Sequence, residues 1–311
     1  MSTKTKLIKI LGSLILLSII IYRIDLGKTL KILTQANIGI YLISFAIFLI
    51  GLILSSFRWG LLLKSHGKKL KFLKLLRMYS LGLVFNFTLP SDMGGDVVKI
   101  YKLSKNKKIT KTQAALSTLM DRFLGLNAII ILIAAFIPFN PFISSNIQIL
   151  IFSLFLIAVI ATWGILFKKL TPILYPIKFV ARKLNLSKLL EKLLKSFDSY
   201  RKEKKLLTSA FLVSLLFQTL SVLNQYIIFQ AINIQIPILF LFLAIPFTKL
   251  MTALPISIGG VGVREGSLIA ILSTIGISGS EVFAYTLLTY TFPLILAITY
   301  AGILFFENII K

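Results

Sequence analysis

The 311-residue sequence contains no cysteine and a single histidine, His66. Without cysteine, the chain can form neither a disulfide framework nor a thiolate metal site, and it has no cysteine nucleophile. His66 lies in a basic stretch between Lys64 and Lys68, where we expect an ordinary loop residue. No histidine-based metal cluster can be built, and we expect neither a metal site nor a cofactor.

Acidic residues are also scarce. There are 10 Asp and Glu against 35 Lys and Arg, which gives a net charge of +25, and charged residues make up only 14% of the chain. Apolar residues make up 57%, and the mean hydropathy is +0.92. A soluble fold of this length could not bury so much apolar sequence, so the composition predicts an integral membrane protein. Cytoplasmic loops that orient the spans explain the basic residues better than nucleic-acid binding does.

The N-terminus has the layout of a secretory signal without its cleavage site. Lys4, Lys6 and Lys9 precede an apolar run over 10–22, but no small-residue cleavage site follows before Arg23. We therefore predict a retained signal anchor.

Six apolar segments are long enough to cross a bilayer, which takes about 17 to 25 residues. They are 7–23, 38–57, 113–137, 147–168, 206–232 and 283–306. Two other apolar stretches, 72–99 and 238–277, are each interrupted by a proline followed by a glycine pair. This interruption favours re-entrant helical hairpins that enter and leave on the same side, surrounded by protein or a watery cavity.

The basic residues support this topology. With the N-terminus inside, most of them fall in cytoplasmic segments such as 58–77, 99–111 and 168–205, whereas the outer loop 139–146 has no charge. A full crossing by either hairpin would move a basic loop outside, against the positive-inside rule. We expect a multi-pass protein of the cell membrane with both termini in the cytoplasm.

The cytoplasmic segment 169–205 carries a basic amphipathic pattern. Leu186, Leu190 and Leu193 recur at helical spacing, and Lys188 and Lys192 take the opposite face. This pattern is typical of a helix that lies on an anionic inner leaflet, and a solvated loop helix explains it equally well.

Two short motifs match in register. LPSDMGGDVVK (89–99) and LPISIGGVGVR (254–264) share Leu, Pro, a glycine pair, Val and a final cation at a constant offset of 165 residues. Each half, 1–137 and 147–311, contains two spans, a hairpin and a final span. Because three crossings is an odd number, the second half must be inserted upside down. The sequence predicts an all-α integral membrane fold: one domain, 1–311, built as an inverted-topology repeat, as in many secondary transporters.

The residue types of the motifs suit an anion site. Pro90 and Pro255 cannot donate to a helix ladder, so the entering helices should end near them. The glycine pairs, which allow the backbone to approach a ligand closely, are Gly94 with Gly95 and Gly259 with Gly260. The returning helices then begin with unpaired N–H groups, which bind phosphate or carboxylate.

Charged residues at the same depth complete the candidate substrate site. A lone charge at the bilayer centre costs roughly 2.5 to 3.5 kcal/mol, so these charges must pair or face water. The cations, which would neutralise an anionic headgroup, are Lys99, Arg122 and Arg264. The carboxylates, which would position the cations or couple protons, are Asp92, Asp96 and Glu265, with Asp121 beside Arg122. Alternatively, Asp96 caps its helix, and Asp121 with Arg122 and Arg264 with Glu265 form packing pairs or lie near the membrane interface.

A polar stripe marks the span 206–232. Ser214, Gln218, Ser221 and Gln225 share one helix face. They would line a hydrophilic path or form hydrogen bonds between helices, and both readings fit the spacing.

At these residues the sequence resembles the transmembrane, flippase-like domain of lysylphosphatidylglycerol synthases and its stand-alone relatives. The resemblance is carried by NFTLPSDMGGDVVK (86–99), DRFLG (121–125) and LPISIGGVGVREG (254–266), and it adds Asn86 to the candidate site. It extends over essentially the whole chain. It implies movement of lipids, such as aminoacylated phosphatidylglycerol or polyprenyl-phosphate-linked sugars, between leaflets. The first motif ends in Lys99 where many relatives place Arg, and without a soluble aminoacyl-transfer domain we do not expect lysyl transfer.

The sequence thus predicts a translocator of an anionic lipid that works by alternating access at a midplane site, and no enzymatic activity. One alternative is a glycosyltransferase-like membrane enzyme with a polyprenyl phosphate donor, for which Asp92 and Asp96 are the only plausible carboxylate pair. Others are an ion-coupled carrier of organic anions and a scaffold for a lipid-making enzyme. The expected partners are the lipid and the bilayer, with no nucleic acid. A lipid-modifying enzyme is a further candidate partner, and homo-oligomer formation stays open.

Overall fold

The computed structural model describes residues 17–64, 67, 69–88, 94–105, 109–141, 143–166, 200, 202–253, 257 and 260–309. Within these residues every regular element is a helix. The chain forms two compact units, which are described separately. Unit 1 comprises Met1–Ile53, Leu76–Lys99 and Thr219–Lys311, and unit 2 comprises Leu54–Leu75 and Ile100–Gln218.

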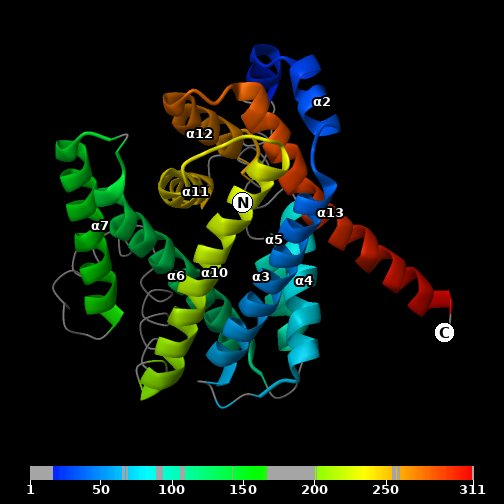
Figure 1. The fold of residues 1–311 in the computed structure, drawn as a ribbon. Coiled ribbons are helices and arrows are strands. Elements are labelled where there is room, and N and C mark those ends of the chain that lie inside the picture. Colours follow the sequence, from blue (N-terminus) through cyan, green and yellow to red (C-terminus); the bar gives the residue numbers. More distant parts are fainter. Residues whose placement is uncertain are drawn as a thin grey trace. The chain divides into compact units, whose positions relative to one another are not determined.

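Unit 1 contains helices from both ends of the sequence (Figure 1). Its own elements are α2 (Leu26–Thr34), α11 (Ile238–Ala253), α12 (Val263–Leu272), η3 (Ser273–Ile275) and α13 (Gly279–Ile309). Unit 2 contains α6 (Lys111–Phe136), η1 (Ile137–Phe139) and α7 (Ser145–Leu166). Four helices contribute residues to both units: α3 (Ile38–Lys64), α4 (Phe72–Thr88), α5 (Gly94–Ser104) and α10 (Lys204–Ala231).

Four of the described helices are long and apolar enough to cross a membrane: Ile38–Lys64, Lys111–Phe139, Lys204–Ala231 and Gly279–Tyr300. They expose large apolar side chains such as Ile43, Ile50, Leu212 and Ile298, as lipid-facing spans do. The predicted spans 38–57, 113–137, 206–232 and 283–306 are therefore confirmed as helices of spanning length. The chain is an all-helical, multi-pass membrane protein.

The other two predicted spans, 147–168 and 7–23, are not among these four helices. Segment 147–168 falls on α7, an uncharged helix of 22 residues, and its stretch Ser145–Ile160 is apolar. Segment 7–23 lies mostly outside the described residues, and so does nearly all of the amphipathic segment 169–205.

Both interrupted stretches form two separate helices each. Helix α4 ends at Thr88 and α5 begins at Gly94, while α11 ends at Ala253 and α12 begins at Val263. The described part of each entering helix reaches to two residues before its motif proline, at Thr88 and Ala253. Pro90, Asp92, Pro255 and Gly259 themselves lie outside the described residues. The re-entrant path and the inverted repeat of 1–137 and 147–311 stay predictions.

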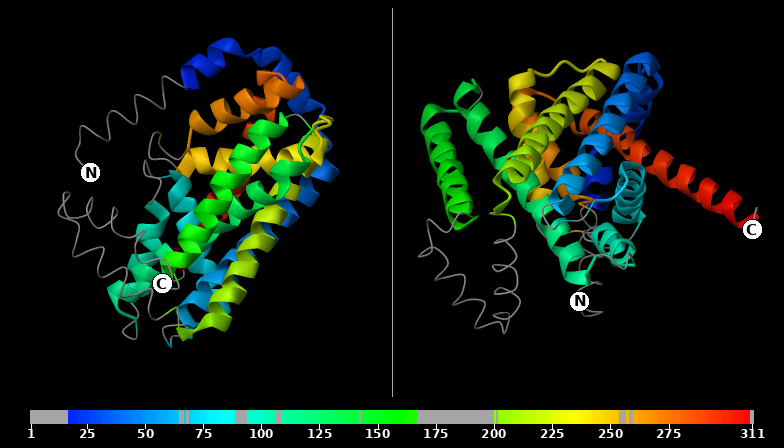
Figure 2. Two further views of the ribbon diagram at one scale, coloured as in Figure 1. Left: turned by 90° about the vertical axis from the view of Figure 1, so that its left-hand side faces the viewer. Right: turned by 90° about the horizontal axis from the view of Figure 1, so that it is seen from below.

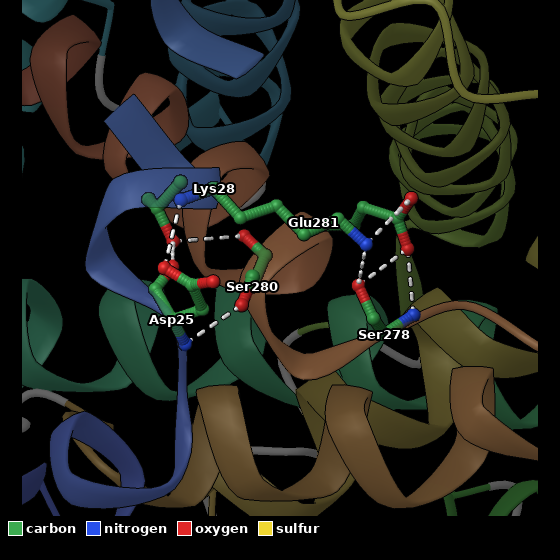
Figure 3. A network of polar contacts seen from close by, with 6 residues as sticks. Asp25, Lys28, Ser278, Ser280 and Glu281 are labelled. Atoms are coloured by element: carbon green, nitrogen blue, oxygen red, sulfur yellow. Dashed lines mark hydrogen bonds and ion pairs between the residues drawn. The ribbon is translucent and has the colours of Figure 1, made fainter. Parts of the chain in front are cut away.

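A polar network holds α2 on the start of α13 in unit 1 (Figure 3). The Asp25 carboxylate caps α2 by accepting from the Lys28 N–H at 2.9 Å, and the Asp25 N–H donates to Ser280 Oγ at 3.0 Å. The Lys28 ammonium donates to Ser278 Oγ at 3.1 Å and lies 3.7 Å from Glu281 Oε1. Glu281 in turn accepts from the Ser278 N–H at 2.7 Å. The N-terminus of α13 is thus capped and attached to α2 by the same few side chains.

Aromatic packing joins α3 to α13 within the same unit. The Tyr41 hydroxyl shares a hydrogen bond with Thr291 and donates to the Leu288 carbonyl at 3.0 Å. The Phe292 ring stacks on Tyr41 at 5.3 Å and contacts Phe45 at 5.5 Å. Such ring pairs add directional attraction to the contact between the two spans.

In unit 2, α6 and α7 lie side by side (Figure 2). Thr110 begins α6 with a capping box in which its hydroxyl accepts from the Gln113 N–H at 3.2 Å. Trp59 is fully buried, and its indole N–H donates to Ser117 Oγ at 3.2 Å. The buried core nearby is formed by Leu61, Leu62, Met120, Leu124, Tyr200, Leu207 and Ala210.

Candidate functional site

At the first motif, α4 and α5 are in direct backbone contact. A Cβ atom on Gly95 would overlap the carbonyl oxygen of Gly82, so only glycine fits there. The Gly95 N–H donates to Asn86 Oδ1 at 2.8 Å, and the Asn86 amide thereby satisfies a backbone donor at the start of α5. The predicted role for Gly95 was close approach to a ligand, whereas in the structure it allows two helices to approach each other.

The cation of the first motif is neutralised by a carboxylate of the same helix. Lys99 Nζ lies 2.9 Å from Asp96 Oδ1, one turn earlier on α5, and 4.4 Å from the centre of the Tyr79 ring. Asp96 is 7% exposed and Lys99 5% exposed. Because the two charges cancel locally, this pair can be buried.

At the second motif, two glycines with positive φ lead into α12. Gly260 has φ of +76° and Gly262, the N-cap of α12, has φ of +82°, a backbone conformation that favours glycine. The buried Glu265 carboxylate accepts from the Gly262 N–H at 2.6 Å and from the Tyr290 hydroxyl at 2.8 Å. Glu265 thus fixes the turn and holds α12 against α13. Both hydrogen bonds give Glu265 a structural role.

Arg264, the cation of the second motif, has different surroundings from Lys99. Its guanidinium lies over the Tyr290 ring, 5.0 Å from the ring centre, and the residue is half-buried. Among the residues that the structure describes, no carboxylate lies within ion-pairing distance of Arg264. The sequence gives the reason, since the position that corresponds to Asp96 at an offset of 165 residues is Val261.

Asp121 and Arg122 belong to unit 2, whereas the described residues of both glycine motifs belong to unit 1. Asp121 is paired with Arg58 of α3: Arg58 Nε lies 2.6 Å from Asp121 Oδ1, and both residues are buried. The Arg58 guanidinium also donates to Ser214 Oγ at 3.1 Å and lies 5.8 Å from the centre of the Phe217 ring. The pair joins α3, α6 and α10 within unit 2. The alternative reading named Arg122 as the partner of Asp121, and it did not foresee the ion pair with Arg58.

Sequence reasoning assigned Arg58 to the cytoplasmic segment 58–77. Helix α3 continues to Lys64, so that segment begins later than expected. A charge usually ends an apolar span, but here Asp121 supplies the countercharge that keeps Arg58 inside the helix. The available signal was the apolar run after it, Leu61 to Leu63.

The polar stripe of α10 makes contacts between helices, as one of its two readings predicted. Each of the four side chains bonds to another helix within its own unit, so the stripe stabilises helix packing. The bonds are Ser214 Oγ with Arg58, Gln218 Nε2 with the Gly125 carbonyl at 3.5 Å, Ser221 Oγ with Lys249 at 2.6 Å, and Gln225 Oε1 with Tyr285 at 2.5 Å.

The comparisons with known proteins agree with this membrane architecture. Residues 6–301 match the family described as the lysylphosphatidylglycerol synthase TM region. The UPF0104 membrane protein MJ1595 of Methanocaldococcus jannaschii is 25% identical over 94% of this chain and 93% of its own length. The UPF0104 membrane protein PH1989 of Pyrococcus horikoshii is 22% identical over 98% of this chain and 97% of its own. A second protein of M. jannaschii, MJ1078, is 29% identical over 73% of this chain and 96% of its own. No solved structure matches the chain. The protein therefore belongs to the lysylphosphatidylglycerol synthase TM region family.

Proposed function

We propose that the protein carries an anionic lipid from one leaflet of the cell membrane to the other. The observation that carries the proposal is the contrast between the two motif cations. Lys99 is neutralised by Asp96, whereas Arg264 has no carboxylate within ion-pairing distance in the described part of the chain. Membership of a family named for a lipid synthase supports a lipid as the cargo.

The physical argument concerns the cost of a charge inside a membrane. A guanidinium without a countercharge is unfavourable in a low-dielectric environment, and an aromatic ring offsets only part of this cost. A phosphate group at Arg264 would supply the countercharge, because the planar guanidinium fork matches phosphate oxygens two at a time. The second motif is therefore the better place for a headgroup to bind.

In this proposal the two motifs are re-entrant hairpins of an inverted repeat, and the repeats rock to open the site to each leaflet in turn. Glu265 keeps the turn before Arg264 in place, since it holds both Gly262 and Tyr290. In the first motif, Asp96 and Lys99 form an ion pair without net charge. No chemical step is needed, and cargo release requires only that the headgroup be exposed to water.

A reconstitution assay tests the proposal. The purified protein is placed in vesicles that contain a trace of headgroup-labelled phosphatidylglycerol, and lipid movement is measured as loss of fluorescence to an impermeant quencher. We expect wild-type protein to accelerate movement over empty vesicles, and Arg264→Ala to reduce the accelerated rate at least tenfold. Lys31→Ala, at an exposed position of α2, should keep the wild-type rate.

Two outcomes would count against the proposal. If no anionic lipid, phospholipid or polyprenyl phosphate, moves faster with wild-type protein than in empty vesicles, the protein is not a translocator. If folded Arg264→Ala and Asp96→Ala proteins both move lipid at the wild-type rate, the motifs are not its site. Soluble phosphate or organic anions that abolish lipid movement by competition would instead indicate a carrier of small anions.

A further inference from the structure

Helix α11 contributes a second cation beside the second motif. Lys249 is half-buried, and its ammonium donates to Ser221 Oγ on α10 at 2.6 Å. Helix α11 packs directly against α12, the helix that begins with the second motif, as Figure 1 shows for these neighbouring segments of unit 1. A short hydrogen bond from α10 therefore fixes the direction of the Lys249 side chain.

Lys249 and Arg264 are connected through the turn at Gly260. A Cβ atom built on Gly260 would lie 3.1 Å from the Thr252 methyl group and 3.8 Å from an Arg264 guanidinium nitrogen. Thr252 is one turn after Lys249, and its hydroxyl donates to the Lys249 carbonyl at 3.0 Å. The end of α11, which carries Lys249, and the start of α12, which carries Arg264, thus meet at the Gly260 turn.

The nearest motif carboxylate is already engaged. One Glu265 oxygen accepts from the Tyr290 hydroxyl and the other from the Gly262 N–H. Glu265 therefore orients the turn and the ring under Arg264, and an additional anion at the turn would be attracted by both cations. The first motif has no such pair of cations. Val84 stands at the position that corresponds to Lys249, and the first motif also carries Asp96 where the second has Val261.

We propose that Lys249 and Arg264 together bind one phosphate group of the transported lipid, with the Tyr290 ring as the wall beneath it. This inference rests on the proposed function and assigns its headgroup contact to the second half of the chain. Arg264 supplies a planar fork and Lys249 a point charge from a different helix, so the ligand must offer several oxygens in different directions. A phosphate does so better than a carboxylate. Ser221 is a positioning residue, since it acts through Lys249.

A binding measurement tests this assignment without any transport step. The detergent-solubilised full chain is titrated by calorimetry with dihexanoyl phosphatidylglycerol, with dihexanoyl phosphatidylcholine as the zwitterionic control and inorganic phosphate as the headgroup alone. We expect Lys249→Met to weaken phosphatidylglycerol binding at least tenfold, and Lys249→Arg to restore most of it. Ser221→Ala should weaken binding less, and Lys31→Met should leave it unchanged.

The outcomes separate this inference from the proposed function. If Arg264→Ala abolishes binding while folded Lys249→Met binds as the wild type does, the two-cation site is wrong and the translocator proposal stands. If wild-type protein binds phosphatidylglycerol through both cations but moves no lipid in vesicles, the site stands and the translocator proposal fails. If inorganic phosphate does not compete with phosphatidylglycerol for the wild-type protein, the phosphate assignment is overturned. Equal affinity for phosphatidylcholine, which carries the same phosphate group, would instead overturn the preference for an anionic lipid. If Lys249→Met does not fold, Lys249→Gln and Ser221→Ala replace it, and unchanged binding by both folded variants would overturn the role of Lys249.

Discussion

Arg58 and Asp121 form a buried ion pair in which 2.6 Å separates the guanidinium Nε from the carboxylate Oδ1. The two residues are 4% and 2% exposed, and Ser214 accepts a further hydrogen bond from the guanidinium. The pair therefore has the neutral, hydrogen-bonded form that buried charges require.

Removing one member of this pair should destabilise the protein strongly. Asp121→Ala leaves the Arg58 charge buried without its carboxylate, which costs about 3 to 5 kcal/mol in comparable buried pairs. Thermal unfolding in detergent, followed by circular dichroism, measures the loss. The double variant Arg58→Met/Asp121→Leu should recover much of it. Similar stability of the single variant and the wild type would show that the pair is not needed for folding.

The contact between Gly82 and Gly95 should tolerate no side chain. Gly95→Ala places a methyl group against the Gly82 carbonyl, and we expect a loss of at least about 3 kcal/mol, at the upper end of overpacking effects, or failure to fold. Gly266→Ala is the matched control, since a Cβ there meets nothing within 4 Å, and it should gain up to about 1 kcal/mol in helix α12. Unfolding midpoints of the two variants give the comparison, and equal midpoints would contradict the packing described for α4 and α5.

Glu265 should be more important for the order of its turn than for binding an anion. Glu265→Gln loses one of two acceptor oxygens and faces the Gly262 N–H or the Tyr290 hydroxyl with an amide donor, at a cost of about 1 to 3 kcal/mol. Tyr290→Phe removes a single partner and should cost less. Chemical denaturation of both variants measures the order of these effects. A Glu265→Gln protein as stable as Tyr290→Phe would show that the carboxylate is not fixing the turn.

The ion pair between Lys28 and Glu281 should contribute little. It is 3.7 Å long, and the two side chains are 47% and 24% exposed, so water screens the interaction. Lys28→Ala should lower stability by less than about 1 kcal/mol. The same thermal assay applies here, with Asp121→Ala as the internal reference for a buried pair. A loss as large as that of Asp121→Ala would mean that the network between α2 and α13 is essential.

The class of the fold could be predicted from the sequence because apolar run length and composition are local properties. Four of the six predicted spans coincide with helices long enough to cross a membrane, and each interrupted stretch forms two separate helices. Both features follow from the chemistry of single segments.

The partners of individual charges could not be predicted, because they depend on which helices meet. Arg58 was assigned to a loop since its carboxylate lies 63 positions later in the sequence. Lys249 was not among the candidate site residues, because its bond to Ser221 of α10 arises from packing. The glycine pair of the first motif shows the same limit, since its sequence fits a ligand contact and a helix contact equally well.

Helix α13 also constrains how the protein meets the bilayer. It has 31 residues, which at about 1.5 Å per residue gives a rod of roughly 46 Å, longer than the roughly 30 Å of hydrocarbon. Hydrophobic mismatch of this size is relieved when a helix tilts from the bilayer normal or extends into the headgroup layer. Pro293 inside the helix removes one ladder hydrogen bond and offers a point for bending. A bilayer of different thickness would therefore change the inclination of α13, and with it the position of the Tyr290 ring relative to the lipid phosphates.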